Sequence, residues 1–127
     1  MTRLGILVAG TVVAATLVHD ALVPSRLSHP RPLPLLVAAL VVAAALLVLA
    51  PRARSIPLTV GAGIAAGGAL ATAIAGVAWQ GGVPNPLAGG GIAFNVADVA
   101  IAVGDALMIA AALVRAWTQR ATLSAPI

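Results

Sequence analysis

The hydrophobic positions of the chain fall into four long runs, separated by short segments that break helices. The runs cover about residues 4–22, 35–50, 56–79 and 95–115. Prolines crowd the segment 24–34, Pro51 follows the second run, and the segment 80–91 is rich in Gly and Pro. No α-helix continues through such segments. Apolar runs of about 20 residues are typical of helices that cross the hydrocarbon core of a bilayer, so the pattern predicts four membrane spans joined by short loops.

Composition places the whole chain in the membrane class. Hydrophobic residues make up 61% of the 127 residues, charged residues make up only 8%, and the mean hydropathy is +1.12. Few positions remain for a second, water-exposed domain. We therefore predict an all-α fold, an integral membrane four-helix bundle in which residues 1–127 form a single transmembrane domain. We expect no sizeable extramembrane domain, and the lipid bilayer is the first predicted partner.

The basic residues indicate how the bundle is oriented. All seven are arginines, and the formal net charge is +4. They lie at the ends of the apolar runs, where basic residues set topology and contact anionic lipid, so no nucleic-acid partner is expected. Four crossings place five of them on the side of both termini, namely Arg3, Arg52, Arg54, Arg115 and Arg120, with Arg26 and Arg31 opposite. The positive-inside rule then predicts a multi-pass protein of a bacterial-type plasma membrane with both termini in the cytoplasm.

The start of the chain also resembles a cleaved signal peptide, because Arg3 precedes an apolar run. However, no Ala-x-Ala-like cleavage site follows the run cleanly, and the helical pattern continues through His19 and Asp20 to Val23. We therefore expect the first run to be retained as a membrane span.

The third run carries small residues at helical spacing. Gly63 and Gly67 form a Gly-x-x-x-Gly pair, and Gly68, Thr72 and Gly76 continue at intervals of four residues. Small residues at this spacing let two helix backbones approach closely. The third helix is therefore predicted to lie at the centre of the bundle.

Candidate chemistry is sparse and lies mainly in the fourth run. The chain has no cysteine, and its two histidines and three aspartates are dispersed, so neither a metal site nor another cofactor is predicted. Asn95, Asp98 and Asp105 nevertheless interrupt an otherwise apolar span. Spacings of three and seven residues place them on one face of a helix, and lipid cannot satisfy such groups. We expect this face to point into the bundle, because ionisable groups within a span are typical of functional sites.

A structural role explains part of the same pattern. Asn95 is a favoured N-cap residue, and Asp98 three positions later would complete a capping box at the start of the helix. For Asp105 the structural alternative is a carboxyl group that is hydrogen-bonded to a neighbouring helix, for example to Thr72. These alternatives stand beside the functional ones.

The segment from Phe94-Asn-Val-Ala-Asp98 to Gly104 resembles the fourth-helix motif of signal peptidase II, the lipoprotein signal peptidase family. That family has four transmembrane helices with both termini inside, and it removes signal peptides from lipid-modified prolipoproteins with two aspartates at the outer membrane face. The resemblance implies a catalytic role for Asp98, a substrate-binding role for Asn95 and Phe94, and lipidated prolipoprotein signal peptides as partners. We include Asp105 as a further candidate substrate-binding residue.

The resemblance is broken in the third run, where the family carries its other catalytic aspartate in a Gly-Asn-x-x-Asp-Arg segment. Thr72, Ala75 and Gly76 stand at the Asn, Asp and Arg positions. An aspartic peptidase needs two adjacent carboxyl groups that share a proton. The dyad is therefore incomplete unless Asp20, at the outer end of the first run, approaches Asp98, and whether the chain is an enzyme stays open at this point.

The sequence thus predicts a signal-peptidase-II-like membrane protein that binds lipoprotein substrates with weak or absent hydrolysis. Two alternatives remain. The first is a small four-helix transporter with Asp105 as its proton or cation site, although the paucity of aromatic residues, at 2%, is unlike small multidrug transporters. The second is a non-catalytic partner subunit of another membrane protein.

Overall fold

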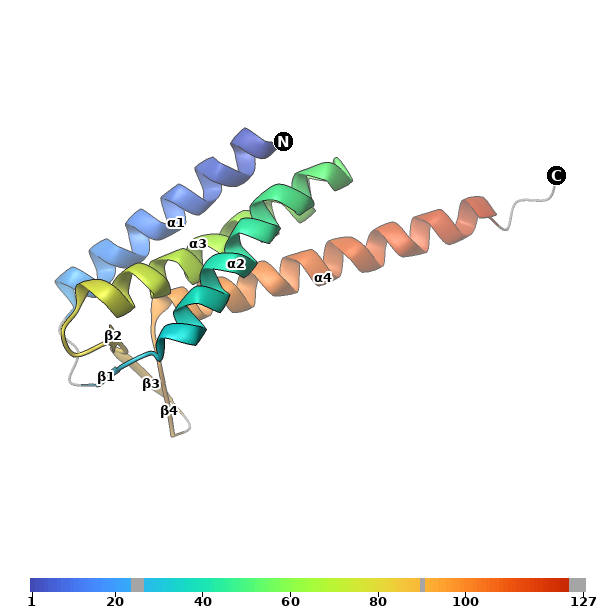
Figure 1. The fold of residues 1–127 in the computed structure, drawn as a ribbon. Coiled ribbons are helices and arrows are strands. Elements are labelled where there is room, and N and C mark those ends of the chain that lie inside the picture. The colour runs from blue at the N-terminus through green and yellow to red at the C-terminus, as the bar shows by residue number, and fades with distance from the viewer. Residues whose placement is uncertain (24–26, 90, 124–127) are drawn as a thin grey trace.

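The computed structural model describes residues 1–23, 27–89 and 91–123, and it is predominantly helical (Figure 1). The helices are α1 (Thr2–Leu22), α2 (Leu33–Leu49), the short 3-10 helix η1 (Ala50–Ala53), α3 (Ile56–Ala78) and α4 (Val96–Leu123). Within the described residues, four helices are long and apolar enough to cross a membrane, which confirms the all-α class and indicates a multi-pass membrane protein. The first three lie within two residues of their predicted bounds, whereas α4 continues past the predicted end at residue 115.

Proline and capping residues set the helix boundaries. Pro32 precedes α2, and α3 begins after Ser55, whose side chain accepts a hydrogen bond from the Leu58 amide at 3.5 Å. Proline at the first turn of a helix costs no hydrogen bond, because the amides there have no intrahelical acceptor. Arg54, with a φ of 51°, makes the turn between η1 and α3. These local signals explain why the second and third runs fold as separate helices.

Helix α3 lies at the centre and packs against α1, α2 and α4, whereas the outer helices touch one another far less. Its glycines allow this. A Cβ added at Gly67 would lie 2.8 Å from the Ala9 carbonyl oxygen of α1, and one at Gly68 would lie 2.6 Å from the Ala97 carbonyl oxygen of α4. The predicted central position of the third helix is confirmed. The Gly-x-x-x-Gly pair packs against α1, while Gly61 and Gly68 pack against α4.

Four short strands, not predicted from the sequence, join the loops at one end of the bundle. Strand β1 (Ser28–His29) pairs antiparallel with β2 (Val83–Pro84), and β3 (Leu87–Gly89) pairs with β4 (Ile92–Phe94) as a hairpin. The Asn85 amide donates to the Leu27 carbonyl oxygen at 2.8 Å, and its side-chain Nδ2 lies 3.0 Å from His29 Nδ1. The α1–α2 and α3–α4 loops are therefore held together beside the start of α4 (Figure 1).

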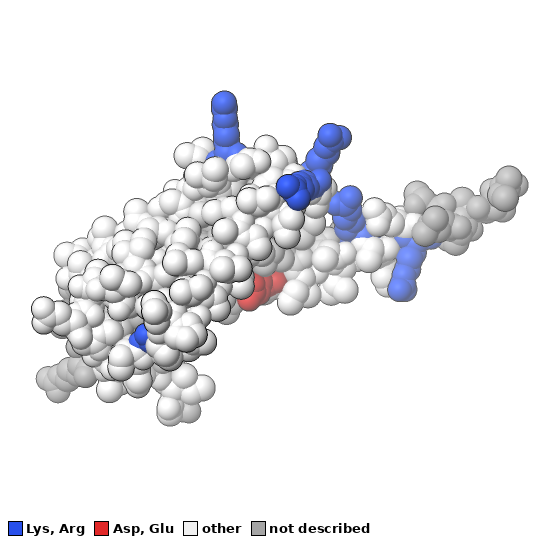
Figure 2. Space-filling view, in the orientation of Figure 1, with Lys and Arg blue, Asp and Glu red and all other residues white. Residues whose placement is uncertain are grey.

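The arginines that the structure describes are divided between the two ends of the bundle (Figure 2). The end with the N-terminus, the α2–α3 connection and the last turns of α4 carries most of them, namely Arg3, Arg52, Arg54, Arg115 and Arg120. Arg31 lies at the end with the strands, and Arg26 is outside the described residues. This division follows the expected one.

Candidate ligand-binding site

The start of α4 is fixed by a reciprocal pair of hydrogen bonds. The Asp98 amide donates to Asn95 Oδ1 at 2.9 Å, and the Asn95 amide donates to Asp98 Oδ2 at 3.1 Å. This is the capping box predicted as the structural alternative, and it satisfies two amides that the helix itself leaves free. Asp98 therefore has a structural role whatever else it does.

Asn95 also connects α4 to the neighbouring strand. Its side chain is fully buried, and Nδ2 donates to the Pro84 carbonyl oxygen of β2 at 3.2 Å. Both polar atoms of the Asn95 side chain are thus used within the protein, one in the cap and one on β2. The Asn95 side chain therefore positions Asp98 and the loop, and its substrate-binding role stays a prediction.

Removal of the Asn95 side chain is expected to destabilise the protein. Loss of the cap costs about 0.5–2 kcal/mol, and leaving the buried Pro84 carbonyl unpaired costs about 1–3 kcal/mol more. Asn95→Ala should therefore lower the free energy of unfolding by about 2–4 kcal/mol, measured by denaturant titration in detergent micelles. Asn95→Ser keeps a capping oxygen, so it should recover the stability that the cap contributes but not the part that comes from the hydrogen bond to the Pro84 carbonyl. Equal stability of Asn95→Ala and the wild type would contradict both roles.

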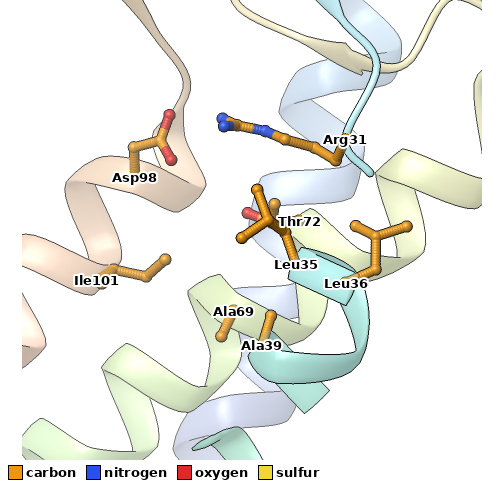
Figure 3. Close-up of a pocket in the computed structure, with 8 residues that line it drawn as sticks. All are labelled: Arg31, Leu35, Leu36, Ala39, Ala69, Thr72, Asp98 and Ile101. Carbon is orange, nitrogen blue, oxygen red and sulfur yellow. The ribbon is translucent and has the colours of Figure 1, made fainter. Parts of the chain in front are cut away.

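A cavity of about 160 Å³ lies between α2, α3 and α4, at the end of the bundle that carries the strands. Its wall is mostly apolar, from Leu35, Leu36, Ala39, Ala69 and Ile101. Three polar residues, Arg31, Thr72 and Asp98, complete the lining. Figure 3 shows the Arg31 side chain extended across the cavity toward the Asp98 carboxylate, with Thr72 below the Arg31 side chain in this view. Sequence analysis had assigned Arg31 only to topology.

The polar residues of the cavity retain hydrogen-bonding capacity. Arg31 Nε and Thr72 Oγ1 are buried and have no hydrogen-bond partner within the described part of the chain. In the described part of the chain, no guanidinium nitrogen of Arg31 lies within 4.0 Å of a carboxylate oxygen of Asp98, so the two do not form an ion pair. A buried polar group that lacks a partner is costly. Such groups facing a cavity are suited to a ligand that supplies the missing acceptor and donor.

A second, larger hollow lies beside the first. It measures about 620 Å³ and shares Arg31 and Leu35 with the cavity between the helices. Loop and strand residues complete its lining, including His29, Asn85, Ile92 and Ala93. An apolar cavity between helices thus lies next to a more polar hollow beside the β3–β4 hairpin, and Arg31 lines both. We call the two together the Arg31 groove.

Asp20 is not among the residues that line the Arg31 groove. It is buried near the end of α1, with His19 Nδ1 3.6 Å from its Oδ1. Neither carboxyl oxygen has a hydrogen-bond partner among the described residues, so Asp20 shares no direct hydrogen bond with Asp98. It lines a separate cavity of about 300 Å³ with Ser28 and Trp79. The two carboxyl groups therefore do not form the hydrogen-bonded pair that an aspartic dyad requires.

Two further positions from the motif comparison can be placed. Ala75, at the position of the family's second catalytic aspartate, is buried within α3. Phe94 is half-buried at the end of β4, where it pairs with Leu87. Among the described residues that line the Arg31 groove, Asp98 is the only acidic one.

Asp105 corrects one expectation. Its side chain is exposed on the bundle surface, not turned inward as predicted. Helix α4 contacts α3 through Ala97, Ile101 and Gly104, and Asp105 lies about 100° round the helix from Gly104. Thr72 Oγ1 has no hydrogen-bond partner in the described residues, so the suggested bond to Asp105 is absent. The transporter alternative requires a path along Asp105, which in a single chain lies on the outer surface.

Comparison of the chain with protein-family models, with curated proteins and with solved structures finds no match. Among the described residues, the helix cavity of the groove combines an apolar wall with Arg31, Thr72 and Asp98, and the adjoining hollow adds His29 and Asn85.

Proposed function

We propose that the protein is a four-span, signal-peptidase-II-like membrane protein that binds the lipidated segment of lipoprotein precursors in the Arg31 groove without cleaving it. The observation that carries this proposal is the apolar cavity between α2, α3 and α4 with Arg31, Thr72 and Asp98 among its lining residues. Both termini lie in the cytoplasm, so the groove opens at the outer face of the plasma membrane. The arginine distribution described above supports this orientation.

The groove suits an amphiphilic ligand. An acyl chain or apolar side chain is accommodated by the wall formed by Leu35, Leu36 and Ile101. The Arg31 guanidinium supplies several N–H donors for a carbonyl or phosphate oxygen. Asp98 uses Oδ2 in the helix cap and has Oδ1 to accept a peptide N–H, since no hydrogen bond to Oδ1 joins it to another described residue. A lipidated cysteine next to a peptide backbone presents all of these groups together.

Binding without hydrolysis follows from the number of carboxyl groups. An aspartic peptidase uses one ionised carboxylate to activate water and one protonated carboxyl to polarise the scissile carbonyl. Asp98 is the one acid lining the groove, and Asp20 lines another cavity and shares no hydrogen bond with it. One carboxylate cannot hold both roles at once.

A fluorescent diacylglyceryl-cysteine peptide, titrated into the protein in nanodiscs, tests this function. We expect saturable binding, no cleavage product by mass spectrometry, and no binding of the same peptide without its acyl chains. Arg31→Gln should weaken binding about 10- to 100-fold, because a hydrogen bond to a charged group contributes about 1.5–3 kcal/mol. Arg52→Gln, at the opposite end of the bundle, is the matched control and should bind like the wild type.

Two results would overturn the proposal. If binding did not depend on the acyl chains, lipidated peptides would be excluded as the ligand. Efficient cleavage that Asp98→Asn abolishes would show an active peptidase and would direct attention to Asp20 as the second carboxylate.

A further inference from the structure

Asp105 lies on the exposed surface of α4, in the middle of the membrane-spanning length. From Val96 to Arg115 the helix rises about 29 Å, close to the ~30 Å of a bilayer core. Asp105 is nine residues after Val96 and ten before Arg115, so it is about 14–15 Å from either boundary. Depth alone therefore separates this carboxyl group from both aqueous surfaces.

The surface around Asp105 is apolar and unpartnered. Ala102, Ile109 and Ala112, which share its side of the helix, are all exposed. In Figure 1, α4 diverges from the other helices toward its C-terminus. Only a small share of the α4 span is buried, in contrast to α3. A carboxyl group turned toward lipid at this depth is expensive, and such residues normally face protein.

We propose that this face of α4 binds a transmembrane helix of another protein, one that carries a Lys or Arg at mid-span to pair with Asp105. Charge complementarity identifies the partner. A basic side chain from a neighbouring helix satisfies the carboxyl group in a medium of low dielectric, where an ion pair is strong. The small side chains of Ala102 and Ala112 allow the second helix to approach closely.

A second copy of this chain does not supply that partner. The chain has no lysine, and the arginines that the structure describes lie near the two ends of the bundle, none of them at the depth of Asp105. A twofold contact through this face would place Asp105 against Asp105, because such an interface joins identical patches. The required cation at mid-depth must therefore come from a different chain.

Designed membrane peptides provide the probe. One peptide has a Leu/Ala helix with a single Lys at its centre, a second has Leu at that position, and a third has the Lys near one end. Energy transfer between labelled protein and labelled peptide in liposomes reports association. We expect the central-Lys peptide to bind and the other two to bind at least 10-fold more weakly.

Variants locate the contact. Asp105→Asn should weaken binding of the central-Lys peptide about 10-fold or more, and Asp105→Glu should retain it. Asp20→Asn, which removes the same charge at a buried position near the end of α1, is the control and should leave binding unchanged. Because Asp105 is exposed, Asp105→Asn should fold normally.

Two results would overturn this proposal. One is equal binding of the central-Lys and central-Leu peptides by the wild type. The other is energy transfer between two copies of the protein that Asp105→Asn abolishes, which would assign the face to self-association. Neither outcome bears on the lipopeptide groove, so the two proposals fail separately.

Discussion

Gly104→Leu is expected to separate α4 from α3 and to cause a large loss of stability. A Cβ at this position would lie 2.5 Å from the Ala65 amide nitrogen and 2.6 Å from the Gly61 carbonyl oxygen. These are backbone atoms of the central helix, so they cannot move aside as a flexible side chain could. Overpacking of this kind typically costs about 1–3 kcal/mol and occasionally more, and we expect at least the upper value. Unfolding in a mixed-micelle denaturant titration measures it.

Gly10→Leu is the matched control for this substitution. Gly10 is also within a helix, but a Cβ there would meet nothing within 4 Å. The change should be neutral or slightly stabilising, because leucine is the better helix former by several tenths of a kcal/mol. Similar losses for both variants would show that the close α3–α4 approach does not hold the bundle together.

The helices could be predicted because each has a local cause. Long apolar runs require a helical backbone in a membrane, and prolines mark their limits. The central position of α3 was also predictable, because glycine at four-residue spacing has a direct packing consequence, as Gly63 and Gly67 show. Which outer helix each glycine contacts depends on tertiary geometry, and the sequence pattern did not separate the α1 face from the α4 face.

The strands could not be predicted because their cause is not local. His29 pairs with Val83, far along the chain, and each of these strands has only two residues. Two-residue strands carry no alternating pattern of apolar and polar positions that would announce them. Gly82 is a sequence feature that belongs to this pairing. Its φ is 89°, and a Cβ there would lie 2.5 Å from the His29 carbonyl oxygen, so the close approach of the two loops favours glycine at this position.

Asp98 was selected from the sequence because a carboxylate in an apolar run needs an explanation. It lines the groove, and its catalytic role stays a prediction. Arg31 was missed as a site residue, since nothing in the sequence shows that the loop pairing returns it to the start of α4. Asp98 and Asp105 share one side of α4, as their spacing predicts. Residues of α2 lie opposite Asp98, whereas Asp105, two turns further along, is exposed.

The strand pairing therefore positions the polar residues of the groove. Pairing of β1 with β2 fixes His29, and Arg31 follows two residues later. Asn95 fixes α4 to the same strand through the Pro84 carbonyl and at the same time orients Asp98. The arginine and the aspartate thus come from distant segments, but both are positioned against β2, which explains why they face each other across the groove (Figure 3).

Filling the apolar part of the groove should abolish ligand binding without harming the fold. Ala39 of α2 lines the cavity of about 160 Å³, which has room for the added atoms of a leucine side chain. The added atoms gain van der Waals contacts with the cavity wall, so Ala39→Leu should keep or raise the free energy of unfolding. The same side chain occupies the volume that an acyl chain needs, and binding of the lipidated peptide should fall more than 10-fold.

Ala38→Leu separates this effect from a general change in α2. Ala38 is the neighbouring residue on the same helix, but it is exposed and is absent from the cavity wall. Its replacement adds the same apolar volume outside the groove, so peptide binding should match the wild type. If Ala39→Leu proved as stable as expected and still bound the peptide with unchanged affinity, the acyl chain would have to bind somewhere other than between α2, α3 and α4. Loss of binding together with retained stability would locate the ligand there, because only occupation of the cavity distinguishes the two variants.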